Sequence, residues 1–172
     1  MEKPTSLRLI EAAYAVLARE GAKGATVRAI EGEAGVPHGS VRHHFGGRAG
    51  LILALVDDLI ADDHARLPEG PDAMMARMLG PDRNRTIARY ELFLLATRDE
   101  TLRARVVDAR DQLVALASDA GVSAPAARSL VAAVDGFILD GLLRRDMGPD
   151  ISTLAALAAR TGSEGFGNLP PR

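Results

Sequence analysis

Residues 26–48 read TVRAIEGEAGVPHGSVRHHFGGR, and this stretch decides how the rest of the chain is interpreted. Thr26 is a good N-cap for a helix whose inner face carries Ile30. That helix must end at Gly35, because glycine adopts the left-handed conformation of a C-cap without steric cost. Pro37 then suits the first turn of a new helix. Two short helices joined by a turn that contains glycine predict a helix-turn-helix.

The second helix of this stretch has one apolar side and one polar side. Val36 and Val41 supply the apolar side, and His38, Arg42 and His43 are polar side chains able to donate hydrogen bonds. A polar face of this kind is an ordinary solvated surface in many helical proteins. The turn residues on either side favour the alternative, a face that contacts a ligand or nucleic acid.

The pattern T-V-R-x-I-x-x-x-A-G-V-x-x-G-S-V-x-x-H-F-x-G-R in residues 26–48 resembles the DNA-binding end of the tetracycline-repressor (TetR) family of transcription regulators. The resemblance covers residues 5–60 well and continues beyond them as a similar order of helices. The three pieces A-G-V, G-S-V and H-F-x-G-R are in register, which is more specific than any one alone. The resemblance implies a three-helix DNA-binding head followed by a helical body that binds a ligand and dimerises.

Carried over position by position, the resemblance places the start of the recognition helix at residues 38–40. Such a helix enters the major groove, where its first residues meet base edges. Residues near Thr26 suit phosphate contact, and Arg42 is a possible guanine reader. Phe45 is expected in the core and not between bases. The expected DNA-binding residues are Thr26, Arg28, His38, Gly39, Ser40, Arg42, His43, His44 and Arg48.

Two positions depart from the family pattern. The family usually has a small alanine where this chain has Glu31, and a tyrosine where it has Arg42. One hypothesis is that Glu31 and Arg42 pair, which would occupy Arg42 and alter base preference. The alternative is that both side chains point to solvent.

Composition excludes several classes of protein. The 172 residues are 47% hydrophobic, which is ample for a core, and they include no cysteine. Disulfides, thiol catalysis and cysteine-based zinc sites are therefore excluded. His38, His43 and His44 suggest a metal site, but no carboxylate stands beside them at ligand spacing, so neither a metal nor another cofactor is expected. The chain also lacks an apolar run of ~18 residues, the length that spans a membrane, and no signal peptide is expected because charges occur throughout residues 1–20. A cytoplasmic protein without membrane contact is expected.

Charge is distributed unevenly along the chain. Residues 1–48 carry seven basic and five acidic side chains, whereas the remainder carries fourteen basic and eighteen acidic ones. A mildly basic head on an acidic body suits DNA binding at one end. The difference is small enough to arise by chance.

Hydrophobic periodicity predicts an all-α chain of about nine helices, without strands or internal repeats. Three domains are expected: residues 1–47 as the helix-turn-helix head, 48–162 as the helical body and 163–172 as a mobile tail. Glycine and proline mark most helix ends. The expected helices span residues 6–20, 26–34, 38–45, 48–66, 72–79, 83–97, 100–120, 124–145 and 151–160. Asp82 and Ser123 are expected to cap the helices that follow them.

The expected helix 124–145 is apolar on most faces and must be covered on most faces. With the helix at 151–160 it is expected to pair with its copy in a homodimer, and burial within a monomer is the competing interpretation. The expected interface residues are Leu130, Val134, Ile138, Leu142, Leu154 and Leu157.

A small-molecule pocket is implied by the resemblance and only hinted at by the residues. Methionine and aromatic side chains often line apolar ligand sites, although at helical spacing they are more often ordinary core. The candidate lining residues are Met74, Met78, Tyr90, Phe93 and Phe137.

The sequence thus favours a homodimeric transcriptional regulator that binds a palindromic operator. It is expected to act as a repressor that an unidentified small-molecule effector releases from DNA. No nucleophile–base pair, phosphate loop or metal cluster points to an enzyme. The alternative is a helical protein-interaction module whose head no longer binds DNA, and Glu31 is the main argument for it.

Overall fold

The computed structural model describes residues 3–69 and 71–145. Within them the chain forms eight α-helices and no strand, which confirms the all-α prediction. The helices are α1 (Thr5–Gly24), α2 (Val27–Ala34), α3 (Ser40–Phe45), α4 (Arg48–Arg66), α5 (Pro71–Leu79), α6 (Arg83–Ala96), α7 (Glu100–Asp119) and α8 (Ala124–Arg144), with a 3₁₀ turn, η1 (Leu67–Glu69), after α4. The helix expected at 151–160 and the tail lie outside the described residues.

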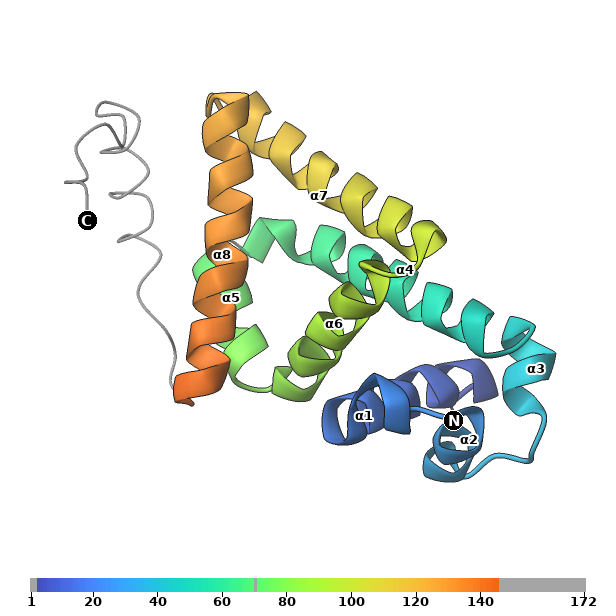
Figure 1. Ribbon diagram of the computed structural model, residues 1–172. Helices are drawn as coiled ribbons and strands as arrows, with labels where there is room; N and C mark the ends of the chain where they lie inside the picture. The colour runs from blue at the N-terminus through green and yellow to red at the C-terminus, as the bar shows by residue number, and fades with distance from the viewer. Residues whose placement is uncertain (1–2, 70, 146–172) are drawn as a thin grey trace, which may run out of the picture.

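Helices α1, α2 and α3 form a small head at one end of the molecule, and α4 leads from α3 into the body (Figure 1). Helices α7 and α8 form the far side of the body, and α6 lies between them and the head. α1 packs along α6 as well as against α2. The head is therefore joined to the body by more than the connecting helix α4.

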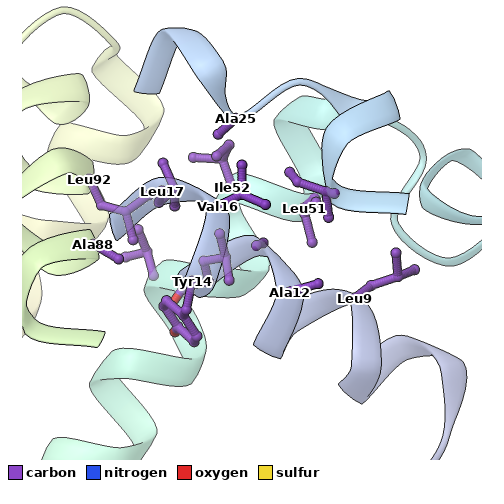
Figure 2. Close-up of a cluster of buried hydrophobic side chains, with 14 of the residues drawn as sticks. Leu9, Ala12, Tyr14, Val16, Leu17, Ala25, Leu51, Ile52, Ala88 and Leu92 are labelled. Carbon is purple, nitrogen blue, oxygen red and sulfur yellow. The ribbon is translucent and has the colours of Figure 1, made fainter. Parts of the chain in front are cut away.

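One apolar core runs through the head and into the body (Figure 2). Leu9, Leu17 and Ile30 from the head are fully buried together with Leu51 at the start of α4 and Leu92 in α6. Burial of an aliphatic side chain of this size stabilises the fold by about 1.5–3 kcal/mol. The shared core resists separation of α1 from α4 and α6, so the head has a defined position.

A second, smaller core lies between α5, α6 and α8. Met75, Met78 and Leu79 of α5 pack there against Ile138 and Leu142 of α8. Ile138 is 1% exposed and Leu142 is 9% exposed. The sequence analysis placed Ile138 and Leu142 in the dimer interface. The structure corrects this expectation, because both side chains face the chain's own core.

The other positions expected at the dimer interface are distributed differently. Leu130 and Val134 are half-buried, and Leu154 and Leu157 lie outside the described residues. Beyond the first turn of α8, the exposed apolar positions are Ala132, Gly136, Leu139 and Leu143.

Three local expectations about helix ends are also corrected. The chain continues through one more helical turn after Gly21, which interrupts α1 with φ 67° and ψ −179° and does not end it. Asp82 makes no side-chain cap to α6, since its carboxylate pairs with Arg77. Ser123 caps α8 only through its backbone carbonyl, which accepts from the Ala127 N–H at 2.8 Å.

None of the helices within residues 3–69 and 71–145 is both long enough and apolar enough to span a membrane.

Candidate nucleic-acid interface

The turn between α2 and α3 depends on two glycines. Gly35 ends α2 with φ 61° and ψ 40°, and its N–H bonds back to the carbonyls of Glu31 and Gly32, as the sequence predicted. Gly39 adopts φ 91°, a value that residues with a Cβ rarely adopt. This left-handed residue delays the start of α3 to Ser40, so the expectation that the helix begins at Pro37 or His38 is wrong.

The surface of α3 is polar, and its inner side is anchored by one buried residue. Val41 is fully buried in the head core, and Phe45 packs against the same core, as expected. Arg42, His43 and His44 are exposed. One short helix thus offers hydrogen-bond donors to solvent while its apolar side fixes its position.

The other residues that were expected to contact DNA lie around the exposed side of α3. Thr26, Arg28, His38, Gly39 and Arg48 are exposed, and Ser40 is half-buried with its hydroxyl donated to the Pro37 carbonyl at 2.6 Å. The Thr26 hydroxyl accepts from the Ala29 N–H at 3.2 Å, which confirms the N-cap of α2. The Thr26 backbone N–H is donated to the Gly24 carbonyl at 2.7 Å and is not available to phosphate.

Glu31 has a structural role that neither sequence-based alternative anticipated. Its side chain is buried, with the residue only 2% exposed. Oε1 accepts from the backbone N–H groups of Gly39 and Val41, each at 3.0 Å. Oε2 lies 3.3 Å from Nδ1 of His38. One carboxylate on α2 therefore holds the turn and the first residues of α3.

These contacts replace the hypothesis that Glu31 pairs with Arg42. The hydrogen bond from the Val41 N–H, helped by those from His38 and Gly39, lowers the pKa of Glu31 from its ordinary 4.5, against the opposing effect of desolvation. Glu31 is therefore ionised at neutral pH and acts within the fold. The Arg42 guanidinium makes no hydrogen bond or ion pair within the described part of the chain, which leaves its donors available to a partner.

Two arginines position the helix-turn-helix from outside it, and sequence reasoning missed the first. Arg8 of α1 donates to the carbonyls of Ala34 and Gly35 at 2.7 and 3.0 Å, so it holds the C-terminal end of α2. Arg48 donates to the carbonyls of Ala22 and Ala25 at 2.9 and 3.2 Å. Arg48 thus ties the start of α4 to the end of α1, a role beyond the expected DNA contact.

Polar contacts also join the head to the body. The Tyr14 hydroxyl in α1 bonds to the Leu55 carbonyl at 2.7 Å and to the Asp58 carboxylate at 2.9 Å. Arg85 of α6 stacks over the Tyr14 ring at 4.4 Å and donates to Asp58 at 2.7 Å. Because these groups lie on α1, α4 and α6, they lock the three helices together near the centre of the molecule.

The residues expected to line a ligand pocket come together, but as a packed core. Met78 is 9% exposed, and Met74, Tyr90 and Phe137 pack around the same cluster. Phe93 meets Tyr90 edge to face, with ring centroids 6.1 Å apart. The cavity that Met74 and Met78 border measures about 20 Å³, room for about one water molecule. A larger ligand enters there only if the helices separate.

A larger cavity, of about 540 Å³, lies nearer the head. It is formed by the first turns of α4, the end of α6 and the start of α7, and sequence reasoning did not identify it. Its lining includes Arg48, Ile52, Leu53, Leu95, Arg98 and Leu102.

Comparison with known proteins agrees with this architecture. Residues 9–55 match the family described as bacterial regulatory proteins, tetR family, and residues 62–162 match the tetracyclin repressor-like C-terminal domain. The HTH-type transcriptional repressor AcnR of Corynebacterium glutamicum is 34% identical over 116 residues, which are 62% of this chain and 60% of AcnR. The chain thus spans less than two thirds of that relative's length.

Solved structures resemble the chain over most of its length. A member of the TetR family from Streptomyces coelicolor A3 superposes with a TM-score of 0.73 at 29% identity, covering 92% of this chain and 98% of that one. The multidrug binding protein EbrR, in complex with malachite green, gives a TM-score of 0.71 at 28% identity, covering 90% and 96%.

Proposed function

Because the chain belongs to the tetracycline-repressor family of bacterial regulatory proteins, we propose that it is a sequence-specific DNA-binding transcriptional regulator. In this proposal, residues 1–47 form the DNA-binding head, residues 48–162 form the body that dimerises and binds an effector, and residues 163–172 are a tail. The protein acts as a repressor in the cytoplasm. AcnR, its partial relative, carries the description of a transcriptional repressor.

The observation that carries the proposal is the way in which α3 is presented. Val41 fixes one side of the helix in the core, Glu31 holds its first turn, and Arg42, His43 and His44 remain exposed on the other side. A helix held rigidly by its apolar side, with its donors exposed, suits insertion into the major groove. Arg28 and Arg48 on the flanking helices suit contacts to the phosphate backbone.

Dimerisation is proposed through the outward-facing positions of α8 and not through Ile138 and Leu142. Leu139 is 43% exposed and Leu143 is 74% exposed. Ala132 and Gly136 continue the same side of the helix and would allow a second backbone to approach closely. A two-fold dimer would place two heads on successive turns of DNA and would read a palindrome.

Release by a small molecule is the proposed mode of control. EbrR, a structural relative, has been solved with malachite green, ethidium and imidazole. An effector that binds one arrangement of the body better than another would shift the population of head positions. The shared core and the Tyr14–Asp58–Arg85 contacts support transmission of such a shift, because they couple α1 to α4 and α6.

The test uses fluorescence anisotropy of labelled duplexes with the full chain. Arg42→Ala should weaken binding to a preferred duplex by on the order of tenfold, since a bidentate base contact discriminates by about 1–3 kcal/mol. Arg103→Ala, an exposed arginine on α7 in the body, is the matched control and should leave affinity unchanged. Affinity of the unmodified chain should fall steeply as salt rises.

The protein-interaction module remains the competing function. It predicts that Arg42→Ala and Arg103→Ala bind duplex DNA equally weakly, with little dependence on salt. The same assay therefore separates the two functions, because the DNA-binding proposal fails if no duplex is preferred by folded, dimeric protein.

A further inference from the structure

We propose that the cavity between α4, α6 and α7 is an effector site for an anionic small molecule with an apolar body. That the site regulates DNA binding rests on the proposed function above, whereas the ligand chemistry rests only on the cavity itself. No DNA contact is required for a ligand to bind there.

The cavity has the size and lining of a small-molecule site. Its volume of about 540 Å³ is within the range of pockets that hold such ligands, about 300–1,000 Å³. Its walls include five apolar side chains: Ala49, Ile52 and Leu53 from α4, Leu95 from α6 and Leu102 from α7. The cavity of about 20 Å³ beside the methionine cluster offers no comparable space.

The charges around the cavity select an anion. Arg48 and Arg98 both line it, and the carboxylate of Asp99 is the opposing charge. Asp99 already accepts the Leu102 N–H at 3.0 Å as the N-cap of α7. The Arg98 guanidinium is exposed and makes no hydrogen bond or ion pair to any residue in the described ranges. Its donors are therefore available to a carboxylate, sulfonate or phosphate group.

Arg48 connects the cavity to the head. Its guanidinium donates to the carbonyls of Ala22 and Ala25, at the end of α1. The Ala22 N–H is in turn donated to the Glu91 carboxylate of α6 at 2.9 Å. An anion in the cavity competes with these two carbonyls for Arg48. Occupancy thus loosens the tie between α4 and the end of α1, which lies just before α2.

Two fluorescent probes with the same apolar body separate charge from hydrophobicity. 8-Anilinonaphthalene-1-sulfonate carries an anionic sulfonate, and N-phenyl-1-naphthylamine lacks it. We expect Arg98→Gln to weaken binding of the sulfonate by about tenfold and to leave binding of the neutral probe unchanged, because a charge-assisted contact is lost. Arg105→Gln, on α7 but outside the cavity, is the matched control.

A second variant tests the location. Thr101 lines the cavity from the exposed start of α7, and Thr101→Trp should reduce the affinity of both probes by partly filling the space. Circular dichroism checks that each variant is folded. Sulfonate binding that is unaffected by Arg98→Gln, or that falls equally with Arg105→Gln, would overturn the proposed site.

The regulatory step is measured with a duplex recovered by selection from a random pool. 8-Anilinonaphthalene-1-sulfonate at a concentration near its Kd for the unmodified chain should weaken DNA binding of that chain, and should affect Arg98→Gln much less because the variant's site stays mostly empty. If the probe binds through Arg98 and DNA affinity does not change, the coupling is wrong. If no duplex is recovered while probe binding still depends on Arg98, the DNA-binding function fails and the ligand site stands.

Discussion

The Oε1 atom of Glu31 accepts the backbone N–H of Val41 at 3.0 Å, so a carboxylate buried in α2 holds the first turn of α3. The same oxygen also accepts the Gly39 N–H at 3.0 Å. An acidic residue under a DNA-binding helix would repel phosphate if it were exposed. Here the Glu31 carboxylate is buried, and hydrogen bonds from backbone N–H groups and from His38 stabilise its negative charge.

Glu31→Ala should weaken DNA binding by on the order of tenfold, because the two backbone N–H groups lose their acceptor and the start of α3 loses its fixed position. Glu31→Gln keeps an oxygen where Oε1 stands and should retain most of the affinity. Anisotropy with a preferred duplex measures both variants. Equal affinity of the alanine variant and the unmodified chain would show that α3 is positioned without Glu31.

Acid should remove the contribution of Glu31 to stability. Hydrogen bonds from Val41, His38 and Gly39 lower the folded-state pKa of Glu31 below 4.5. A carboxyl group with a lowered pKa stabilises the fold fully above its ordinary pKa, and this contribution disappears as pH falls through the folded-state value. The free energies of unfolding of the unmodified chain and of Glu31→Gln, measured with urea, should differ by a constant amount above about pH 5.5. The two values should converge in acid. A difference that grows in acid would contradict the lowered pKa.

Gly21→Ala should reduce the free energy of unfolding by about 1–3 kcal/mol, since φ 67° with ψ −179° is accessible almost only to glycine. Space is not the obstacle, because a Cβ there would meet the Glu91 carboxylate at an ordinary 3.5 Å. Gly32→Ala is the matched control. It lies within α2 where a Cβ meets nothing within 4 Å, so it should be neutral or stabilising. Similar losses for both variants would contradict this account.

Both tyrosines should resist ionisation in the folded protein. Burial is the largest cause that raises the pKa of Tyr14 and of Tyr90 above the ordinary value of 10.0. The folded chain keeps these protons where the unfolded chain releases them, so stability should fall as pH rises above 10. Phenolate absorbance should therefore appear together with loss of helical circular dichroism. Phenolate formation in folded protein near pH 10 would contradict the burial of these hydroxyls.

Local signals predicted much of the head correctly. Thr26 and Gly35 act through their own side chain or backbone conformation, so their roles as N-cap and C-cap are visible in the sequence. The partners of Glu31 are backbone N–H groups eight and ten residues away, and no residue pattern encodes them. Arg8 was missed for the same reason, because its acceptors are the carbonyls of Ala34 and Gly35.

The body was harder to predict because periodicity alone does not choose a face on an apolar helix. α8 is apolar on most sides, and the stripe through Ile138 and Leu142 proved to face α5. The stripe through Leu139 and Leu143 is exposed. Likewise, methionine and aromatic residues between α5, α6 and α8 form a packed core, whereas the larger cavity combines residues from three separate helices.

Selection from a random duplex pool at fixed moderate salt decides whether a dimer of this chain reads DNA through α3. We expect enrichment of a palindrome whose two half-sites are about one helical turn apart, and we expect Arg42→Ala to change the preferred bases within each half-site. Enrichment of no sequence by folded, dimeric protein would contradict this expectation, and would assign the exposed face of α3 to another partner.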